Sequence, residues 1–247
     1  MEQFLIVCPL VFLAGFVDSI AGGGGLISFP AYLLAGVPVH VILGTSKLSS
    51  FPGSIVAAAR FGKSGFIRWK LAVPCGILAA AGAFAGAKIA LGVEETIIKS
   101  LMIVVLPIVA FYVLWGKKTD EKETEELPFK TLLILGAAVS LVIGMYDGFY
   151  GPGTGTFLIL AFTGLLKMGT RDAAGISKFV NLAADIGALL TFGASGKVNV
   201  VLGVVAALFC MAGSYFGSGL VVNNGQKVVR PVILTVLALL FVRVLAG

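Results

Sequence analysis

The stretch DSIAGGGGLISFP, residues 18–30, joins two apolar segments, 4–21 and 26–37, through a run of four glycines. The second segment is too short to cross a bilayer as a helix. A dozen residues at ~1.5 Å each cover only about 18 Å of the roughly 30 Å of hydrocarbon. Extended residues ahead of it could add about 13 Å and complete the crossing. The stretch therefore predicts a broken span, part helix and part extended chain.

Composition places this broken span in an integral membrane protein. The chain has 247 residues, a mean hydropathy of +1.05, 58% hydrophobic residues and only 12% charged residues, which is outside the range of soluble domains. Its only sustained polar stretch is WGKKTDEKETEELPFK, residues 115–130. The first segment has neither a basic start nor a small-residue cleavage site, so we expect a retained helix and not a signal peptide.

The chain contains the same pattern twice. DGFYGPGTGTFL, residues 147–158, repeats the acid and the glycines of the first stretch at a spacing of 129, and G-x-S-K recurs at a spacing of 131. The matched positions are Gly15, Asp18, Gly22 and Gly24 with Gly144, Asp147, Gly151 and Gly153; Gly44, Ser46 and Lys47 with Gly175, Ser177 and Lys178; and Gly82 and Gly86 with Gly213 and Gly217. We predict a first transmembrane repeat at 1–115, a cytoplasmic charged linker at 116–130 and a second transmembrane repeat at 131–247.

Each repeat divides into five apolar segments, and the second segment of each is short. The segments are 4–21, 26–37, 41–60, 68–91, 97–115, 131–150, 156–166, 172–192, 198–220 and 228–246. If all ten cross, more Lys and Arg lie in cytoplasmic loops than if eight cross, so the positive-inside rule favours ten, with 60–70 and 116–130 cytoplasmic. Because five is odd, the second repeat would be inverted. We predict an all-α protein of the bacterial inner or plasma membrane, built from two inverted five-segment repeats, each with a short broken helix after a Gly-rich stretch.

Glycines directly before each short helix indicate a place where an anion could bind. Helix N-termini present free N–H groups and a partial positive charge, and glycine lets a ligand approach the backbone. The alternative is that these glycines serve close helix packing, as small residues do in membranes. The candidate anion-binding residues here are Gly23, Gly24, Gly25, Gly153, Thr154 and Gly155.

The two G-x-S-K lysines lie several residues inside apolar segments. A charge at mid-bilayer costs about 2.5 to 3.5 kcal/mol, so such a residue normally faces a cavity or a partner. We expect Lys47 and Lys178 to contact the substrate from opposite repeats. The alternative is that they snorkel, or pair structurally with the aspartates. Neighbouring polar residues are candidate cavity lining: Ser46, Ser177, Asn181, Ser50 and Ser54.

Three aspartates lie within the apolar segments. Asp18 and Asp147 come just before the two Gly-rich stretches, and Asp185 lies one helical turn after Asn181. These carboxylates could cap a short helix or pair with a lysine. They could instead bind a coupling proton or cation.

The paired motifs resemble a known family. The GGGG run before a proline-containing helix, the LGTSK that follows, and GFYGPGTGTFL in the second half are similar to the sulfite exporter TauE/SafE family of membrane permeases. The resemblance covers nearly the whole chain. It implies transport of small sulfur-containing anions such as sulfite, thiosulfate or organosulfonates. The halves also differ, because Pro52-Gly53 interrupts the third segment of the first half only.

Inverted repeats with interrupted helices are typical of secondary transporters. We therefore expect a permease in the lipid bilayer that moves a small anion by alternating access at a midplane site, and the alternative is an anion channel with a lysine-lined constriction. An enzyme is disfavoured, because neither G-x-S-x-G nor H-E-x-x-H occurs. The scattered positive charges disfavour nucleic acid. No cofactor or metal is expected from one histidine and three cysteines without C-x-x-C spacing.

Overall fold

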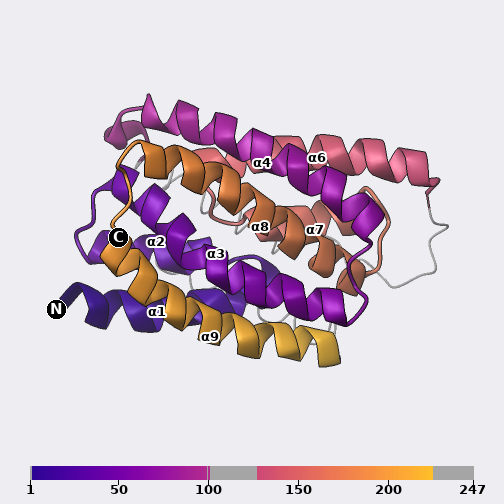
Figure 1. The fold of residues 1–247 in the computed structure, drawn as a ribbon, viewed down its shortest axis with the longest axis horizontal. Helices are drawn as coiled ribbons and strands as arrows, with labels where there is room; N and C mark the ends of the chain where they lie inside the picture. The colour runs from indigo at the N-terminus through magenta and orange to yellow at the C-terminus, as the bar shows by residue number, and fades with distance from the viewer. Residues whose placement is uncertain (1, 99, 101–126, 225–247) are drawn as a thin grey trace.

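A computed structural model describes residues 2–98, 100 and 127–224, which form helices and the loops between them without a strand (Figure 1). The helices are α1 (Glu2–Ala21), α2 (Gly25–Leu34), α3 (Val39–Lys63), α4 (Trp69–Leu91), α6 (Phe129–Phe149), α7 (Thr154–Gly164), α8 (Thr170–Ala194) and α9 (Val200–Asn224). Five of them, α1, α4, α6, α8 and α9, are long and apolar enough to span a membrane. The prediction of an all-α integral membrane protein is confirmed.

The two short segments form short helices. α2 has 10 residues and α7 has 11, and each follows a Gly-rich break in the chain. The side-chain amide of Gln3 donates a hydrogen bond to the carbonyl of Ala35 at 3.0 Å. The chain therefore returns, after the break, to the end of the bundle where α1 begins. The long helix α3 is not one of the five apolar spans, because its polar run around Lys47 lowers its hydropathy.

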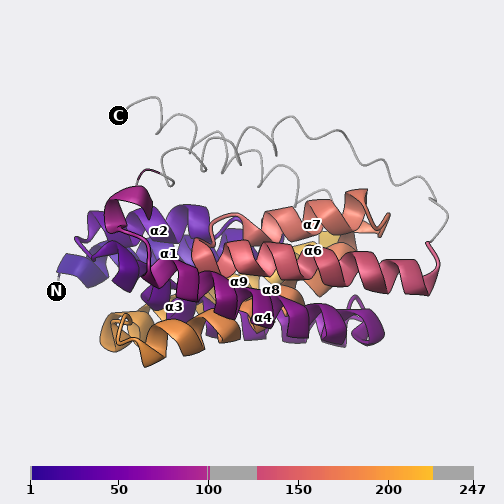
Figure 2. The same ribbon diagram turned by 90° about the horizontal axis from the view of Figure 1, so that it is seen from above.

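The helices of the two halves follow each other in the same order but run in opposite directions. In Figure 1, α1, α3 and α9 run one way, and α4, α6 and α8 run the other. The first helix of each half packs mainly against a helix of the other half: α1 against α9, and α6 against α4. Figure 2 shows the two short helices on the same side of the bundle, one toward each end.

Glycines let these helix pairs approach closely. A Cβ added to Gly82 of α4 would lie 2.3 Å from the carbonyl oxygen of Leu141, and one added to Gly144 of α6 would lie 2.4 Å from that of Ala79. On the other side of the bundle, a Cβ at Gly213 of α9 would lie 2.0 Å from the carbonyl oxygen of Phe12. Such contacts leave no room for a side chain, and they replace the hydrophobic driving force that lipid does not supply.

Large apolar side chains cover the outside of the bundle. Leu5, Ile77, Ile134 and Leu208 are each more than 60% exposed. In water such a surface would be unstable, whereas lipid tails solvate it as well as another apolar side chain does. The outer surface therefore fits a bilayer environment.

The structure corrects two predictions from the sequence, and others concern residues that it does not describe. The expected interruption at Pro52 is wrong, because α3 continues as one helix from Val39 to Lys63 through this proline. α6 begins at Phe129, inside the stretch predicted as linker. The predicted segments 97–115 and 228–246 and most of the linker 116–130 lie outside the described residues.

Candidate binding site

The two Gly-rich breaks meet near the middle of the bundle. The backbone N–H of Thr156 donates to the carbonyl of Gly22 at 3.3 Å, and its hydroxyl donates to that of Ala21 at 2.7 Å. Gly22 has φ +75, and a Cβ there would lie 2.1 Å from the carbonyl carbon of Gly155. Only glycine fits such a crossing. The N-terminal ends of α2 and α7 are thereby brought together (Figures 1 and 2).

Both helix ends have unused hydrogen-bond donors. Within the described part of the chain, the backbone N–H groups of Gly25 and Gly155 have no hydrogen-bond partner. Both residues line a cavity at the crossing. One N–H therefore comes from each half, each at the positive end of a helix dipole, which is the arrangement that favours a bound anion.

The cavity has a volume of about 60 Å³ and lies between the two halves. A single water needs about 10 to 15 Å³ on this scale, so there is room for several waters or a small ion. Its polar and glycine lining comes from Gly15, Asp18, Gly22, Gly24, Gly25, Ser28, Ser46, Lys47, Ser49, Ser50, Asp147, Tyr150, Gly151, Thr154, Gly155, Asn181 and Asp185.

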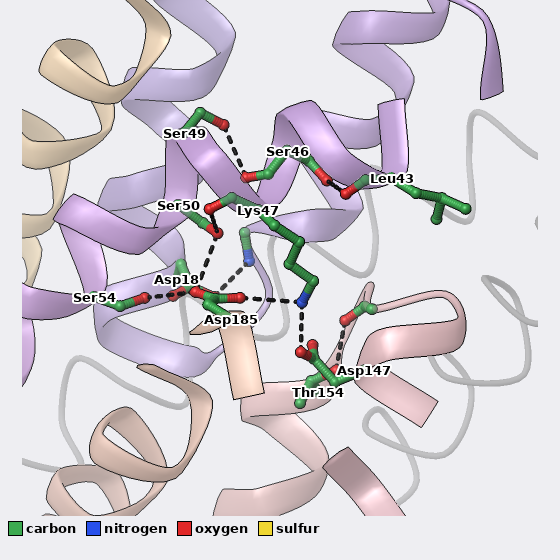
Figure 3. Close-up of polar contacts among 12 residues, drawn as sticks. Asp18, Leu43, Ser46, Lys47, Ser49, Ser50, Ser54, Asp147, Thr154 and Asp185 are labelled. Carbon is green, nitrogen blue, oxygen red and sulfur yellow. Dashed lines mark hydrogen bonds and ion pairs between the residues drawn. The ribbon is translucent and has the colours of Figure 1, made fainter. Parts of the chain in front are cut away.

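Lys47 extends from α3 between two carboxylates of the other half (Figure 3). Its Nζ donates to Asp147 Oδ2 at 2.5 Å and to Asp185 Oδ1 at 3.1 Å. The hydroxyls of Ser50 and Ser54 donate to Oδ2 of Asp185 at 3.2 and 3.3 Å. We call these five residues the Lys47 cluster. Lys47 is 8% exposed, and its ammonium faces the cavity.

Lys178 has a simpler environment. Its Nζ donates to Asp18 Oδ2 at 2.7 Å, and Asp18 Oδ1 accepts the backbone N–H of Gly24 at 3.2 Å. We call Lys178 and Asp18 the Lys178 pair. Lys178 is only 1% exposed and does not line the cavity. Asp18 therefore ties the break ahead of α2 to a lysine of the second half.

The pairing crosses between the halves in a matched way. Lys47 of the first half binds Asp147 of the second, and Lys178 of the second half binds Asp18 of the first. These are the positions that the sequence repeat relates to each other. Asp185 is the exception, since the residue 131 positions earlier is Ser54. A single position thus adds a second carboxylate on the Lys47 side.

Most of the residues proposed from the sequence gather at this cavity. Those that line it are Lys47, Gly24, Gly25, Thr154, Gly155, Ser46, Asn181, Asp18, Asp147 and Asp185. Ser50 lines it as well, and five do not: Lys178, Gly23, Gly153, Ser177 and Ser54. Gly153 begins α7 from a left-handed conformation with φ +88, so its place in the structure is explained by the turn.

Sequence reasoning missed several lining residues. Tyr150 is 2% exposed, and its buried hydroxyl has no hydrogen-bond partner in the described residues. Ser28 and Ser49 also face the cavity, and Ser49 accepts a hydrogen bond from the hydroxyl of Tyr32 at 2.8 Å. Tyr150 stands inside the second Gly-rich stretch and Ser49 two residues after Lys47. Their position within the motifs could have identified them as lining residues.

One more polar group in the cavity lacks a partner. Asn181 is 7% exposed and lines the cavity, and its amide makes no hydrogen bond to any described residue. Buried amides and phenols normally have a partner. Asn181, Tyr150 and the two free N–H groups therefore leave several donors available to a further ligand. The described residues contain no group of three or more His, Cys, Asp or Glu suited to a metal ion.

The bundle and its buried ionised cavity define a multi-pass membrane protein of the transporter class. The family model described as Sulfite exporter TauE/SafE matches residues 7–244, and the chain belongs to this family. "Probable membrane transporter protein ORF9" of Sinorhizobium sp is 35% identical over 243 residues, covering 98% of this chain and 92% of the relative.

Two further relatives have similar coverage. "Probable membrane transporter protein YfcA" of Escherichia coli (strain K12) is 35% identical over 240 residues, covering 94% of this chain and 86% of the relative. "Probable membrane transporter protein YdhB" of Bacillus subtilis (strain 168) is 26% identical over 224 residues, covering 88% and 89%. No solved structure matches significantly. The protein is thus a membrane transporter of the TauE/SafE family.

Proposed function

We propose that the protein is a secondary transporter for a small sulfur-containing anion such as sulfite, thiosulfate or an organosulfonate. The anion would bind in the cavity between two inverted repeats and cross by alternating access. The observation that carries this proposal is the cavity itself, where Lys47, the N–H groups of Gly25 and Gly155, and the Asn181 amide converge from both halves. Together they supply one full positive charge and several neutral donors, which matches the acceptor-rich surface of an oxyanion.

Alternating access is supported by the way the halves are joined. Matching helices run in opposite directions (Figure 1), and the buried ion pairs link one half to the other. Interrupted helices at the interface of inverted repeats are the usual place for a transporter site, and access changes when one repeat moves against the other. Ion pairs across that interface can break and reform as the halves move.

The choice of a sulfur-containing substrate rests on membership of the family and not on the chemistry of the cavity. Charge and hydrogen-bond donors recognise oxygen atoms and negative charge, so they would accept several oxyanions of similar size. A volume of about 60 Å³ favours small anions over bulky ones. Sulfite, thiosulfate, sulfate, isethionate and sulfoacetate form a suitable series, with acetate as the comparison anion.

Two measurements test the proposal. Ligands that bind only the folded state raise the melting temperature of purified protein, so sulfur oxyanions should stabilise it and acetate should not. In liposomes, unlabelled anion inside should drive uptake of labelled anion from outside, because a carrier exchanges its substrate. Ionic currents far above carrier turnover would instead identify the anion channel, and absence of stabilisation by any sulfur oxyanion would refute the substrate class.

A further inference from the structure

We propose that the cavity binds its anion together with a proton, and that Asp185 is the group that takes this proton. This inference rests on the proposed transport function and names its coupling ion. It follows from the charges in the cavity, from the kind of hydrogen-bond partners that each carboxylate has, and from the unused donors beside Lys47.

The charges do not balance without an added cation. Among the described residues, the Lys47 cluster and the Lys178 pair hold two ammonium groups and three carboxylates. With every group ionised, these residues have one negative charge in excess. An anion would add to that excess at a depth where uncompensated charge is strongly unfavourable. A proton that enters with the anion removes part of it.

Asp185 is the carboxylate whose partners tolerate protonation. Asp147 is bound by the Lys47 ammonium, and Asp18 by the Lys178 ammonium and the N–H of Gly24. Ammonium and amide N–H groups can only donate, so they favour the ionised carboxylate and offer no acceptor to the O–H of a neutral one. Asp185 also has the hydroxyls of Ser50 and Ser54. A hydroxyl can accept as well as donate, so a neutral Asp185 can reverse one of these bonds and remain hydrogen-bonded.

Of the two carboxylates that bind Lys47, Asp185 makes the longer contact. Its oxygen lies 3.1 Å from Lys47 Nζ, whereas that of Asp147 lies 2.5 Å away. When Lys47 turns toward an anion seated at Asn181 and Tyr150, Asp185 loses its only ammonium partner. Lys47 can keep Asp147, which reproduces the single pairing of Lys178 with Asp18. Proton uptake by Asp185 then replaces the lost counter-charge.

The surroundings of Asp185 hold few other ionisable groups. α3 brings Lys47, α6 brings Asp147, α1 brings Asp18 and α9 brings the Cys210 thiol, while Lys178 lies on α8 itself. α7 contains no ionisable residue. The charged residues of α4, Lys70 and Lys88, are exposed. Lys178 is bound to Asp18. Among the described residues, Lys47 is therefore the one cation that bonds to Asp185, and the anion also needs it.

The test is calorimetry of anion binding to purified protein in buffers that differ in ionisation enthalpy. The probes are isethionate and thiosulfate, whose own charges do not change between mildly acidic and mildly alkaline pH. Wild-type protein should take up about one proton per bound isethionate. Asp185→Asn should bind isethionate with uptake near zero, and its affinity should become insensitive to pH. Asp172→Asn makes an equal charge change in the first turn of α8, where Asp172 pairs with Arg68 and does not line the cavity, so it should behave as wild type.

A second variant guards against misfolding. Asp185→Ser gives the second half the residue type that the first half has at position 54, and it leaves the Lys47 bond to Asp147 in place. It should also bind without proton uptake. If wild-type protein binds anion but takes up no proton, or if both variants still take one up, Asp185 is not the proton carrier, while the proposed function stands. Dependence of binding on sodium in place of pH would overturn it equally. If neither anion binds wild type, the proposed function fails, and this inference fails with it.

Discussion

Lys47 and Lys178 occupy matching positions in the two halves, yet their surroundings differ. Lys178 has one carboxylate, is almost fully buried and lies away from the cavity. Lys47 has two carboxylates and two serines within reach of one of them, and it faces the cavity. The matched pairs Lys47–Asp147 and Lys178–Asp18 hold the halves together. The extra groups on one side provide a place where the pairing can change.

This difference distinguishes the features that both halves share from the features that only one half has. Features common to both halves, such as the glycine breaks and the crossed ion pairs, join one half to the other. Features found once, such as Asp185 and Asn181, are those on which the proposals for proton and anion binding rest. Asp185 stands where the first half has Ser54, and Asn181 stands where it has Ser50. Substitutions on the two sides should therefore have different consequences.

The largest effect should come from labelling the two matching helix ends. Ser64 follows α3 and Ser195 follows α8, and both are exposed. If the halves are inverted, single cysteines at these positions lie on opposite sides of the membrane. With the native cysteines replaced, Ser64→Cys should resist an impermeant thiol reagent in intact cells, whereas Ser195→Cys should react completely. Equal labelling of both cysteines would show that the two helix ends lie on the same side of the membrane, and that the halves are not inverted.

The next effect concerns stability. Lys47→Met leaves two buried carboxylates without an ammonium, and removing one partner of a buried ion pair typically costs about 3 to 5 kcal/mol. Lys178→Met leaves only Asp18, whose side chain is 20% exposed and still accepts the N–H of Gly24. Thermal unfolding in detergent should show the larger loss for Lys47→Met.

A double variant provides the control for this expectation. Adding Asp185→Asn to Lys47→Met removes one of the stranded carboxylates, so part of the lost stability should return. A loss for Lys178→Met that equals or exceeds that for Lys47→Met would show that the second carboxylate does not depend on Lys47.

The sequence predicted the two short helices but not the course of the first one. Extended residues ahead of it were expected to complete a crossing, whereas the chain turns back at the break and brings Ala35 against Gln3. Segments of about a dozen apolar residues after a glycine run cannot cross as helices, and α2 and α7 are short accordingly. Pro52 misled, since a proline can remain inside a transmembrane helix when neighbouring groups satisfy the freed carbonyl. Length and hydropathy are local properties of the chain, which is why they could be read without a structure.

The site was only partly predictable, because its contacts join distant parts of the chain. Lys47 meets Asp147 and Asp185 across 100 and 138 residues. Its motif alone shows Lys47 as an intramembrane charge, and by that criterion replacing it with Met removes a cost and leaves folding intact. The two carboxylates reverse that expectation. Which lysine faces the cavity also depends on helix packing, which identical G-x-S-K motifs do not reveal.

A smaller effect should mark the anion side of the cavity. Asn181→Leu keeps the branched arrangement of heavy atoms but removes an amide that has no partner in the described residues, so folding should be unaffected. If the amide binds the anion, a hydrogen bond to a charged group worth about 1.5 to 3 kcal/mol is lost. Isethionate affinity, measured by calorimetry, should then fall by about tenfold or more. Unchanged affinity would move the anion away from this residue.

The smallest effect separates the two serines that precede the lysines. Ser46 donates its hydroxyl to the carbonyl of Leu43 at 3.0 Å, whereas the buried hydroxyl of Ser177 has no partner among the described residues. Removing a buried group that makes no bond relieves its desolvation, so Ser177→Ala should leave stability unchanged or raise it by up to about 1 kcal/mol. Ser46→Ala loses a bond and should lower stability by about 0.5 to 1 kcal/mol. Paired melting curves measure the difference. A clear loss for Ser177→Ala would mean that its hydroxyl does bind something, and that the Lys178 side also holds a ligand.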